Sequence, residues 1–107
     1  MLETIYNKLV RDKIPEIIEK NGEIAVIHTL NIKEYKTALL EKLIEEAKEL
    51  LNSNGSLDER SDVGEVLSAI DNIFGWSDLD IQEARNSKNN KRGSFTKRIY
   101  LEKTIKE

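Results

Sequence analysis

Apolar residues between positions 32 and 52 recur at the spacing that places them on one side of an α-helix. The apolar positions are Leu39, Leu40, Leu43, Ile44, Ala47, Leu50 and Leu51. Asn31, followed three residues later by Glu34, is a capping pattern that marks where this helix begins. The Asn and Gly of "NSNG" favour an end near Asn52. The pattern therefore predicts a helix over residues 32–52.

Residues 57–74 show the same helical spacing. The apolar positions are Val63, Val66, Leu67, Ile70, Ile73 and Phe74. Ser56 with Glu59 repeats the capping pattern, and Gly75 suits the end of a helix because glycine readily adopts a left-handed conformation. Since only a short turn separates the two helices, we expect them to pack antiparallel with their apolar sides together.

Shorter elements are predicted on either side of this helix pair. Ile14–Lys20 fits a short helix with Pro15 in its first turn, and Ser77 caps a helix that runs through about Asn86, before a polar loop over residues 86–94. Residues 24–30 and 95–101 are predicted to be short β-strands. The expected fold class is all-α, an antiparallel helix bundle with short peripheral strands.

Acidic side chains occupy unexpected positions on both long helices. Glu45, Glu46 and Glu49 form one acidic strip beside the apolar side of the first helix. On the second helix Glu59 falls on the apolar side itself, with Asp62 at its border. An unpaired buried carboxylate is unfavourable, so acids facing the interior need a cation, a metal or a proton. Antiparallel packing brings the acids of the two helices together, and clustered carboxylates are suitable ligands for Mg²⁺.

A simpler interpretation also fits these acids. Glutamate-rich helices are commonly solvated, and Glu59 can be explained as the partner of Ser56 in a capping box. Lys42 and Lys48 can relieve part of the repulsion on the first helix. Asp62 has no such explanation, and the pairing of two acidic strips favours the metal site.

Length and composition indicate one globular domain over residues 1–107, with 38% hydrophobic and 35% charged residues. Such a small domain buries a small share of its surface, so we expect a homodimer or homotetramer. No apolar run approaches the roughly 18 residues that span a bilayer, and charges occur throughout residues 1–20. We therefore expect a cytoplasmic protein without membrane association.

The residue inventory excludes several kinds of chemistry. With no cysteine there is no disulfide, thiolate metal site or cysteine nucleophile, and the single His28 cannot build a multi-histidine zinc site. The net charge of −3 argues against nucleic acid as a partner, because neutralising a phosphate backbone usually needs a basic surplus. Cations nevertheless gather near both ends of the chain, whereas acids crowd its middle.

Two motifs give these acids a specific context. "EEAKE" at residues 45–49 and, after nine residues, "ERSD" at 59–62 resemble the E-E-x-x-E and E-x-x-D motifs of the MazG-like, or all-α, NTP pyrophosphohydrolases. "YNKLVRDKIPEII" from Tyr6 and "KRGSFTKRIYLE" from Lys91 resemble the opening and the ending of a subgroup labelled phosphoribosyl-ATP pyrophosphohydrolase-like. The resemblance covers nearly the whole chain. Lys48 and Gly64 depart from it, since relatives often have a further acid and a larger residue there.

The resemblance implies an all-α NTP pyrophosphatase bundle that hydrolyses a nucleoside triphosphate to the monophosphate and pyrophosphate. The implied ligands of Mg²⁺ or Mn²⁺ are Glu46, Glu49, Glu59 and Asp62, and Glu45 is an additional acid that binds a second ion or positions water. In such enzymes the metal offsets phosphate charge and lowers the pKa of the attacking water, while a spare carboxylate takes its proton. Cations that offset the remaining charge of the triphosphate are candidate substrate ligands: Lys8, Arg11, Lys13, Lys88, Lys91, Arg92 and Arg98.

Two alternatives remain at this level. A phosphoribosyl-ATP pyrophosphohydrolase of histidine biosynthesis would share both the fold and the metal site. A non-catalytic helical dimerisation module, or a nucleic-acid-binding regulator with a basic tail, would have no need of Glu59 and Asp62 on an apolar helix face. We prefer a housekeeping enzyme of the nucleotide pool.

Overall fold

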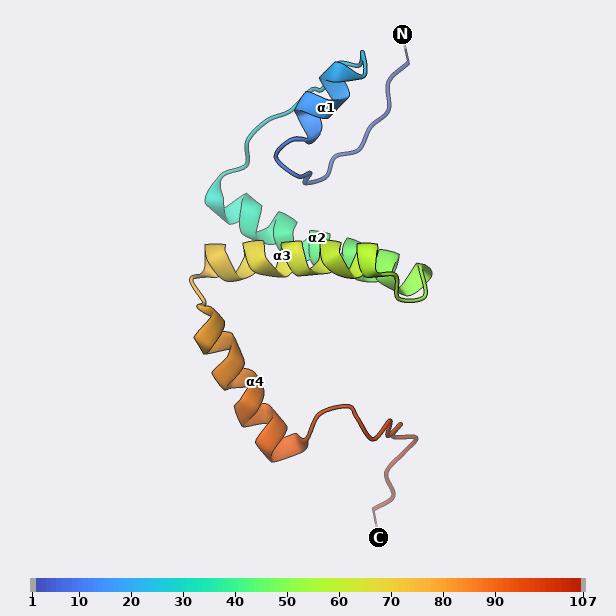
Figure 1. The fold of residues 1–107 in the computed structure, drawn as a ribbon, viewed down its shortest axis with the longest axis vertical. Helices are drawn as coiled ribbons and strands as arrows, with labels where there is room; N and C mark the ends of the chain where they lie inside the picture. Colours follow the sequence, from blue (N-terminus) through green and yellow to red (C-terminus); the bar gives the residue numbers. More distant parts are fainter. Residues whose placement is uncertain (1, 107) are drawn as a thin grey trace. The chain divides into compact units, whose positions relative to one another are not determined.

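The structure, a computed structural model, describes residues 2–106 and contains four α-helices in that range (Figure 1). The helices are α1 (Ile14–Lys20), α2 (Ile32–Asn52), α3 (Leu57–Phe74) and α4 (Asp78–Arg92). The chain divides into two units, Met1–Gly75 with α1 to α3 and Trp76–Glu107 with α4. The all-α fold class is confirmed. Within the described range no helix is long and apolar enough to cross a membrane.

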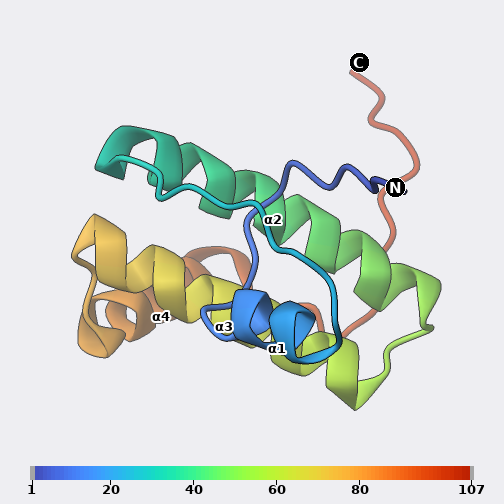
Figure 2. The same cartoon turned by 90° about the horizontal axis from the view of Figure 1, so that it is seen from above.

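Helices α2 and α3 pack side by side and antiparallel, as their short connection predicts (Figure 2). Local signals set their limits: Asn31 and Glu34 form a complete capping box at the start of α2, and Gly75 ends α3 in the left-handed conformation. Leu39 of α2 is buried against Val66 and Ile70 of α3. The partly buried residues around them are Leu9, Tyr35, Leu43, Ala69, Ile73 and Phe74.

The strands predicted at residues 24–30 and 95–101 are wrong, because both segments lack regular secondary structure. A strand is stable only when its backbone N–H and C=O groups pair with a neighbouring strand. Neither unit contains a strand within its described residues that could supply this pairing. Ile24 and Val26 are 82% and 94% exposed, so the apolar residues of the first segment do not cover a sheet.

Helix α4 continues to Arg92, six residues beyond the predicted end at Asn86, and replaces most of the predicted polar loop. Its start is as expected, since Ser77 and Asp80 form a capping box. Its polar residues are exposed and compatible with a solvated helix. Lys91 and Arg92 lie in the last turn, where the negative end of the helix dipole favours cations, and Gly93 follows with a φ of 79°. The helix therefore ends at the first glycine after Ser77.

Gly64, a departure from the resembling sequences, lies inside α3 without a close neighbour from another helix. A Cβ atom there would come within 4 Å of only the Arg60 side chain, 2.9 Å from Nη1, and that flexible group can move. Alanine loses less conformational entropy than glycine in a helix. We expect Gly64→Ala to raise the free energy of unfolding by about 1 kcal/mol in urea titrations.

Gly55 is the matched control for this substitution, because its φ of 89° is unfavourable for a residue with a Cβ. Gly55→Ala should lower the free energy of unfolding. Destabilisation by Gly64→Ala as well would mean that α3 needs close backbone packing at this position.

Candidate metal centre

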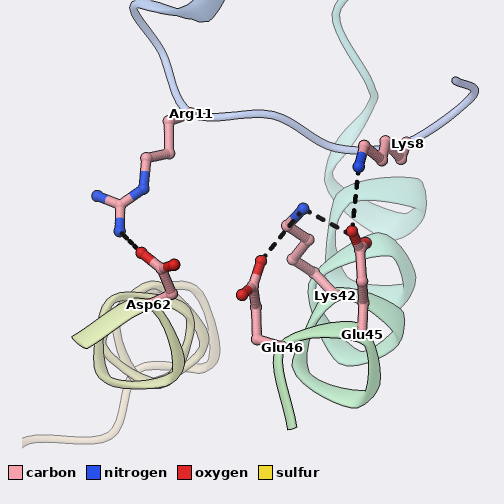
Figure 3. A network of polar contacts seen from close by, with 6 residues as sticks. All are labelled: Lys8, Arg11, Lys42, Glu45, Glu46 and Asp62. Atoms are coloured by element: carbon pink, nitrogen blue, oxygen red, sulfur yellow. Dashed lines mark hydrogen bonds and ion pairs between the residues drawn. The ribbon is translucent and has the colours of Figure 1, made fainter. Parts of the chain in front are cut away.

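Three carboxylates meet where α2 and α3 lie side by side. Glu46 projects from α2, and Glu59 and Asp62 project from the first turns of α3. One carboxylate oxygen from each of them lies within 4.8 Å of the other two. Figure 3 shows Glu46 and Asp62 on the two neighbouring helices. We call Glu46, Glu59 and Asp62 the acidic triad.

The acidic triad lies towards the connecting turn, whereas Leu39 and Ile70 meet farther from it. Its members are partly buried: the Glu46 side chain is 13% exposed and that of Asp62 is 34% exposed. Both residues border the apolar side of their helix, so the antiparallel packing that buries the core also turns these carboxylates towards one another. This is the convergence predicted from the helical pattern.

Glu59 has the least favourable electrostatic environment of the triad. Partial loss of hydration raises the pKa of its carboxyl group, and the negative charges of Asp62, Glu49, Asp58 and Glu46 raise the pKa further. Ionised Glu59 therefore lies among like charges without an ion-pair partner within the described residues. A bound cation would reverse this repulsion.

The capping interpretation does not account for the Glu59 carboxylate. Ser56 Oγ accepts a hydrogen bond of 3.1 Å from the backbone N–H of Glu59, which is half of a capping box. The other half is not formed, because the Ser56 N–H donates to Ser53 Oγ at 3.1 Å. The backbone of Glu59 contributes to the cap, and its carboxylate is left for the triad.

Lys42 is part of the site, although the sequence predicts for it only a partial relief of the repulsion among the acids of α2. Its Nζ lies 3.3 Å from Glu45 and 3.4 Å from Glu46, and its side chain is 16% exposed (Figure 3). The spacing of three and four residues along one helix was the available signal. Lys42 thereby joins the acidic triad to the neighbouring Glu45 and restrains both carboxylates.

Two of the candidate substrate-binding cations, both in the segment before α1, contact acids of this site. Lys8 Nζ donates to Glu45 Oε1 at 3.1 Å, and Arg11 Nη2 donates to Asp62 Oδ1 at 2.8 Å (Figure 3). Partial burial alone would raise the pKa of Glu45, but the hydrogen bond from Lys8 and the charge of Lys42 together lower it. Glu45 is therefore ionised at neutral pH and already has two cationic partners.

The remaining candidate site residues are one acid, Glu49, and five cations. Glu49 is exposed on α2 and outside the triad, although its charge contributes to the raised pKa of Glu59. Lys13 is the residue immediately before α1. Lys88, Lys91 and Arg92 lie on α4 and Arg98 lies after it, all in the second unit. A substrate role for these cations, and a ligand role for Glu49, stay predictions.

The arrangement could hold a hard divalent cation. Mg²⁺ is bound in proteins by a few carboxylate oxygens, and it usually retains waters and recruits phosphates for its other positions. Three converging carboxylates with no sulfur or imidazole ligand among them match that preference.

Comparison with known proteins adds one partial similarity. A stretch of 43 residues is 54% identical to an uncharacterized protein of Mycolicibacterium smegmatis, and it covers 40% of this chain and 44% of that protein. The chain thus spans less than half the length of this relative. No protein-family model matches the chain, and no solved structure matches it. Because the similarity carries no named activity, the chemistry of the site rests on the geometry of its own residues.

Proposed function

We propose that the chain is a Mg²⁺-dependent nucleoside triphosphate pyrophosphohydrolase of the MazG-like kind. The observation that carries this proposal is the acidic triad, in which Glu46 from the E-E-x-x-E motif meets Glu59 and Asp62 from the E-x-x-D motif. The two motifs are separate in sequence, and each supplies the residues that the resemblance marks as metal ligands. A chance resemblance would not require their carboxylates to converge.

The proposed ligands are Glu46, Glu59 and Asp62, joined by Glu49 from the next turn of α2. When bound, Mg²⁺ supplies charge to offset that of the phosphates and makes water more acidic. The protein side chains would hold the reacting groups close together and in a fixed orientation. In the hydrolysis a water oxygen bonds to the α-phosphorus, the bond from that phosphorus to the bridging oxygen breaks, and pyrophosphate leaves. The water proton passes to a carboxylate or to solvent.

Glu45 is the additional acid of this proposal. Because Lys8 and Lys42 lower its pKa, it is a weak proton acceptor and better suited to hold a second cation or to orient water. Lys8 and Arg11 lie beside the acids and are the first candidates to contact the phosphates. Arginine suits a phosphate because its planar guanidinium can make two parallel hydrogen bonds.

The direct test is pyrophosphate release from a panel of ribo- and deoxyribonucleoside triphosphates with Mg²⁺ or Mn²⁺. We expect release of monophosphate and pyrophosphate that stops when EDTA removes the metal. Including phosphoribosyl-ATP distinguishes a nucleotide-pool enzyme from the enzyme of histidine biosynthesis. Absence of turnover on every compound, together with polyanion binding that weakens steeply with salt, would instead favour a nucleic-acid-binding regulator.

We further propose that the enzyme is a homodimer or homotetramer. Among the described residues, burial within the chain is nearly complete only for Leu39, Val66 and Ile70. Leu40 and Ile44 of α2 and Leu67 of α3 stay 46%, 58% and 39% exposed, and a second copy can cover them. Light scattering at micromolar concentration should give twice or four times the mass of the chain, and the mass of a single chain would contradict this proposal.

A further inference from the structure

Arg11 and Asp62 form an ion pair that joins two parts of the chain far apart in sequence. The guanidinium Nη2 lies 2.8 Å from Asp62 Oδ1, and 51 residues separate the two positions. Arg11 belongs to the stretch before α1, which has no helix or strand within its described residues 2–13. Asp62 is fixed in α3 as a member of the acidic triad. A segment without regular secondary structure thus supplies a positive charge to a candidate metal ligand on a helix.

Lys42 provides the contrasting case. It lies on the same helix as the two acids that it contacts, and its side chain is only 16% exposed. Arg11 is 57% exposed and contacts Asp62 from outside the helix pair (Figure 3). An ion pair this exposed contributes little to stability, so a stronger competitor can displace it.

We propose that Arg11 is an internal counterion that neutralises Asp62 in the metal-free protein and is displaced when a divalent cation binds to the acidic triad. This inference rests on the proposed metal site. An Asp62 oxygen that accepts the guanidinium hydrogen bond is not fully available to a metal ion, and the guanidinium charge repels that ion. A divalent cation held by three carboxylates gains more from Asp62 than an exposed guanidinium does. Arg11 therefore lowers the affinity for the metal and keeps the empty site from carrying its full negative charge.

Calorimetric titration with Mn²⁺ of the wild type and Arg11→Gln tests this competition. Removing an exposed ion-pair partner is expected to tighten Mn²⁺ binding about two- to fivefold. Lys20→Gln is the matched control, because Lys20 forms a comparable exposed pair with Glu16 on α1, 3.3 Å apart, without touching the triad. Its affinity for Mn²⁺ should equal that of the wild type.

Lys8→Gln separates displacement from a general effect of charge. Lys8 comes from the same segment, carries the same charge and pairs with Glu45, outside the triad. We expect a smaller increase in affinity than in Arg11→Gln. An equal increase in both variants would attribute the effect to net charge and overturn the displacement of Arg11.

A second measurement follows Arg11 in the wild type. Phenylglyoxal modifies free guanidinium groups, and mass spectrometry of the resulting peptides reports each arginine separately. Mg²⁺ should accelerate modification of Arg11 relative to Arg85, an exposed residue of α4. An unchanged rate at saturating metal would overturn the proposal.

The results also separate this inference from the function on which it rests. If the wild type binds Mn²⁺ and Arg11→Gln binds it with equal or lower affinity, displacement is refuted while the metal site stands. If the wild type binds no divalent metal, the metal site fails and the displacement fails with it.

Discussion

Saturating Mg²⁺ is expected to raise the melting temperature of the wild type by roughly 10–20 °C at a hundredfold excess over its dissociation constant. The ion binds the folded chain, in which the triad is assembled, and has no comparable site in the unfolded chain. Glu59→Gln and Asp62→Asn remove one of the three charged ligands, so their melting temperatures should hardly respond to Mg²⁺. Melting curves with Mg²⁺ and with EDTA measure this difference.

Without metal, Glu59→Gln should melt at a higher temperature than the wild type, the reverse of their order in Mg²⁺. Glu59 has a raised pKa, which means that its ionised form costs folding free energy. The cost is fully present above the folded-state pKa and disappears as the pH falls below the ordinary value of 4.5. The advantage of Glu59→Gln should therefore be present at neutral pH and vanish in acid. Asp62→Asn should gain less, because it also loses the ion pair with Arg11.

Glu65→Gln is the matched control for these melts, since Glu65 is exposed on α3 and outside the acidic triad. Its stability should change by only a few tenths of a kcal/mol with or without metal. A wild type whose melting temperature does not respond to Mg²⁺ or Mn²⁺ would exclude the metal site, and the proposed hydrolase with it.

Turnover should fall by about a hundredfold or more in Glu49→Gln, Glu59→Gln and Asp62→Asn, because even residues that only support metal ligands cost up to that factor. Each amide keeps the size of the side chain but removes a charged oxygen from the proposed site. Activity is thus expected to disappear while the proteins remain folded. Pyrophosphate release from the preferred triphosphate, beside far-ultraviolet circular dichroism, measures both properties.

Glu49→Gln is the most informative of the three. Glu49 lies outside the acidic triad in the structure, whereas the resemblance makes it a ligand. Loss of turnover in this variant would show that Glu49 joins the triad when metal is bound. Full activity would restrict the site to Glu46, Glu59 and Asp62. Glu65→Gln should retain wild-type turnover, and equal loss there would point to a general effect of helix charge.

The sequence by itself determined the helices whose limits depend on local interactions. Asn31 with Glu34 and Ser77 with Asp80 form their capping boxes from residues three apart, so a short segment contains all the information needed. The apolar spacing then specified which sides of α2 and α3 face each other, and with it that acids of the two helices converge. It did not specify that Glu46, rather than Glu45 or Glu49, is the acid of α2 that meets Glu59 and Asp62. Such predictions succeed because helix periodicity converts sequence spacing directly into geometry.

The tertiary structure decided the features that depend on partners distant in sequence. Residues 24–30 have a strand-like composition, but a strand needs a neighbour and none is present in the described part of that unit. The spacing of the acids could not show that Glu46 is 13% exposed and Glu45 35% exposed, since burial depends on what packs against each residue. From the sequence, Arg11 is one of seven candidate substrate ligands, and none of them is assigned a contact with Asp62. Its contact with Asp62 depends on the path of the chain over 51 intervening residues, which no local pattern encodes.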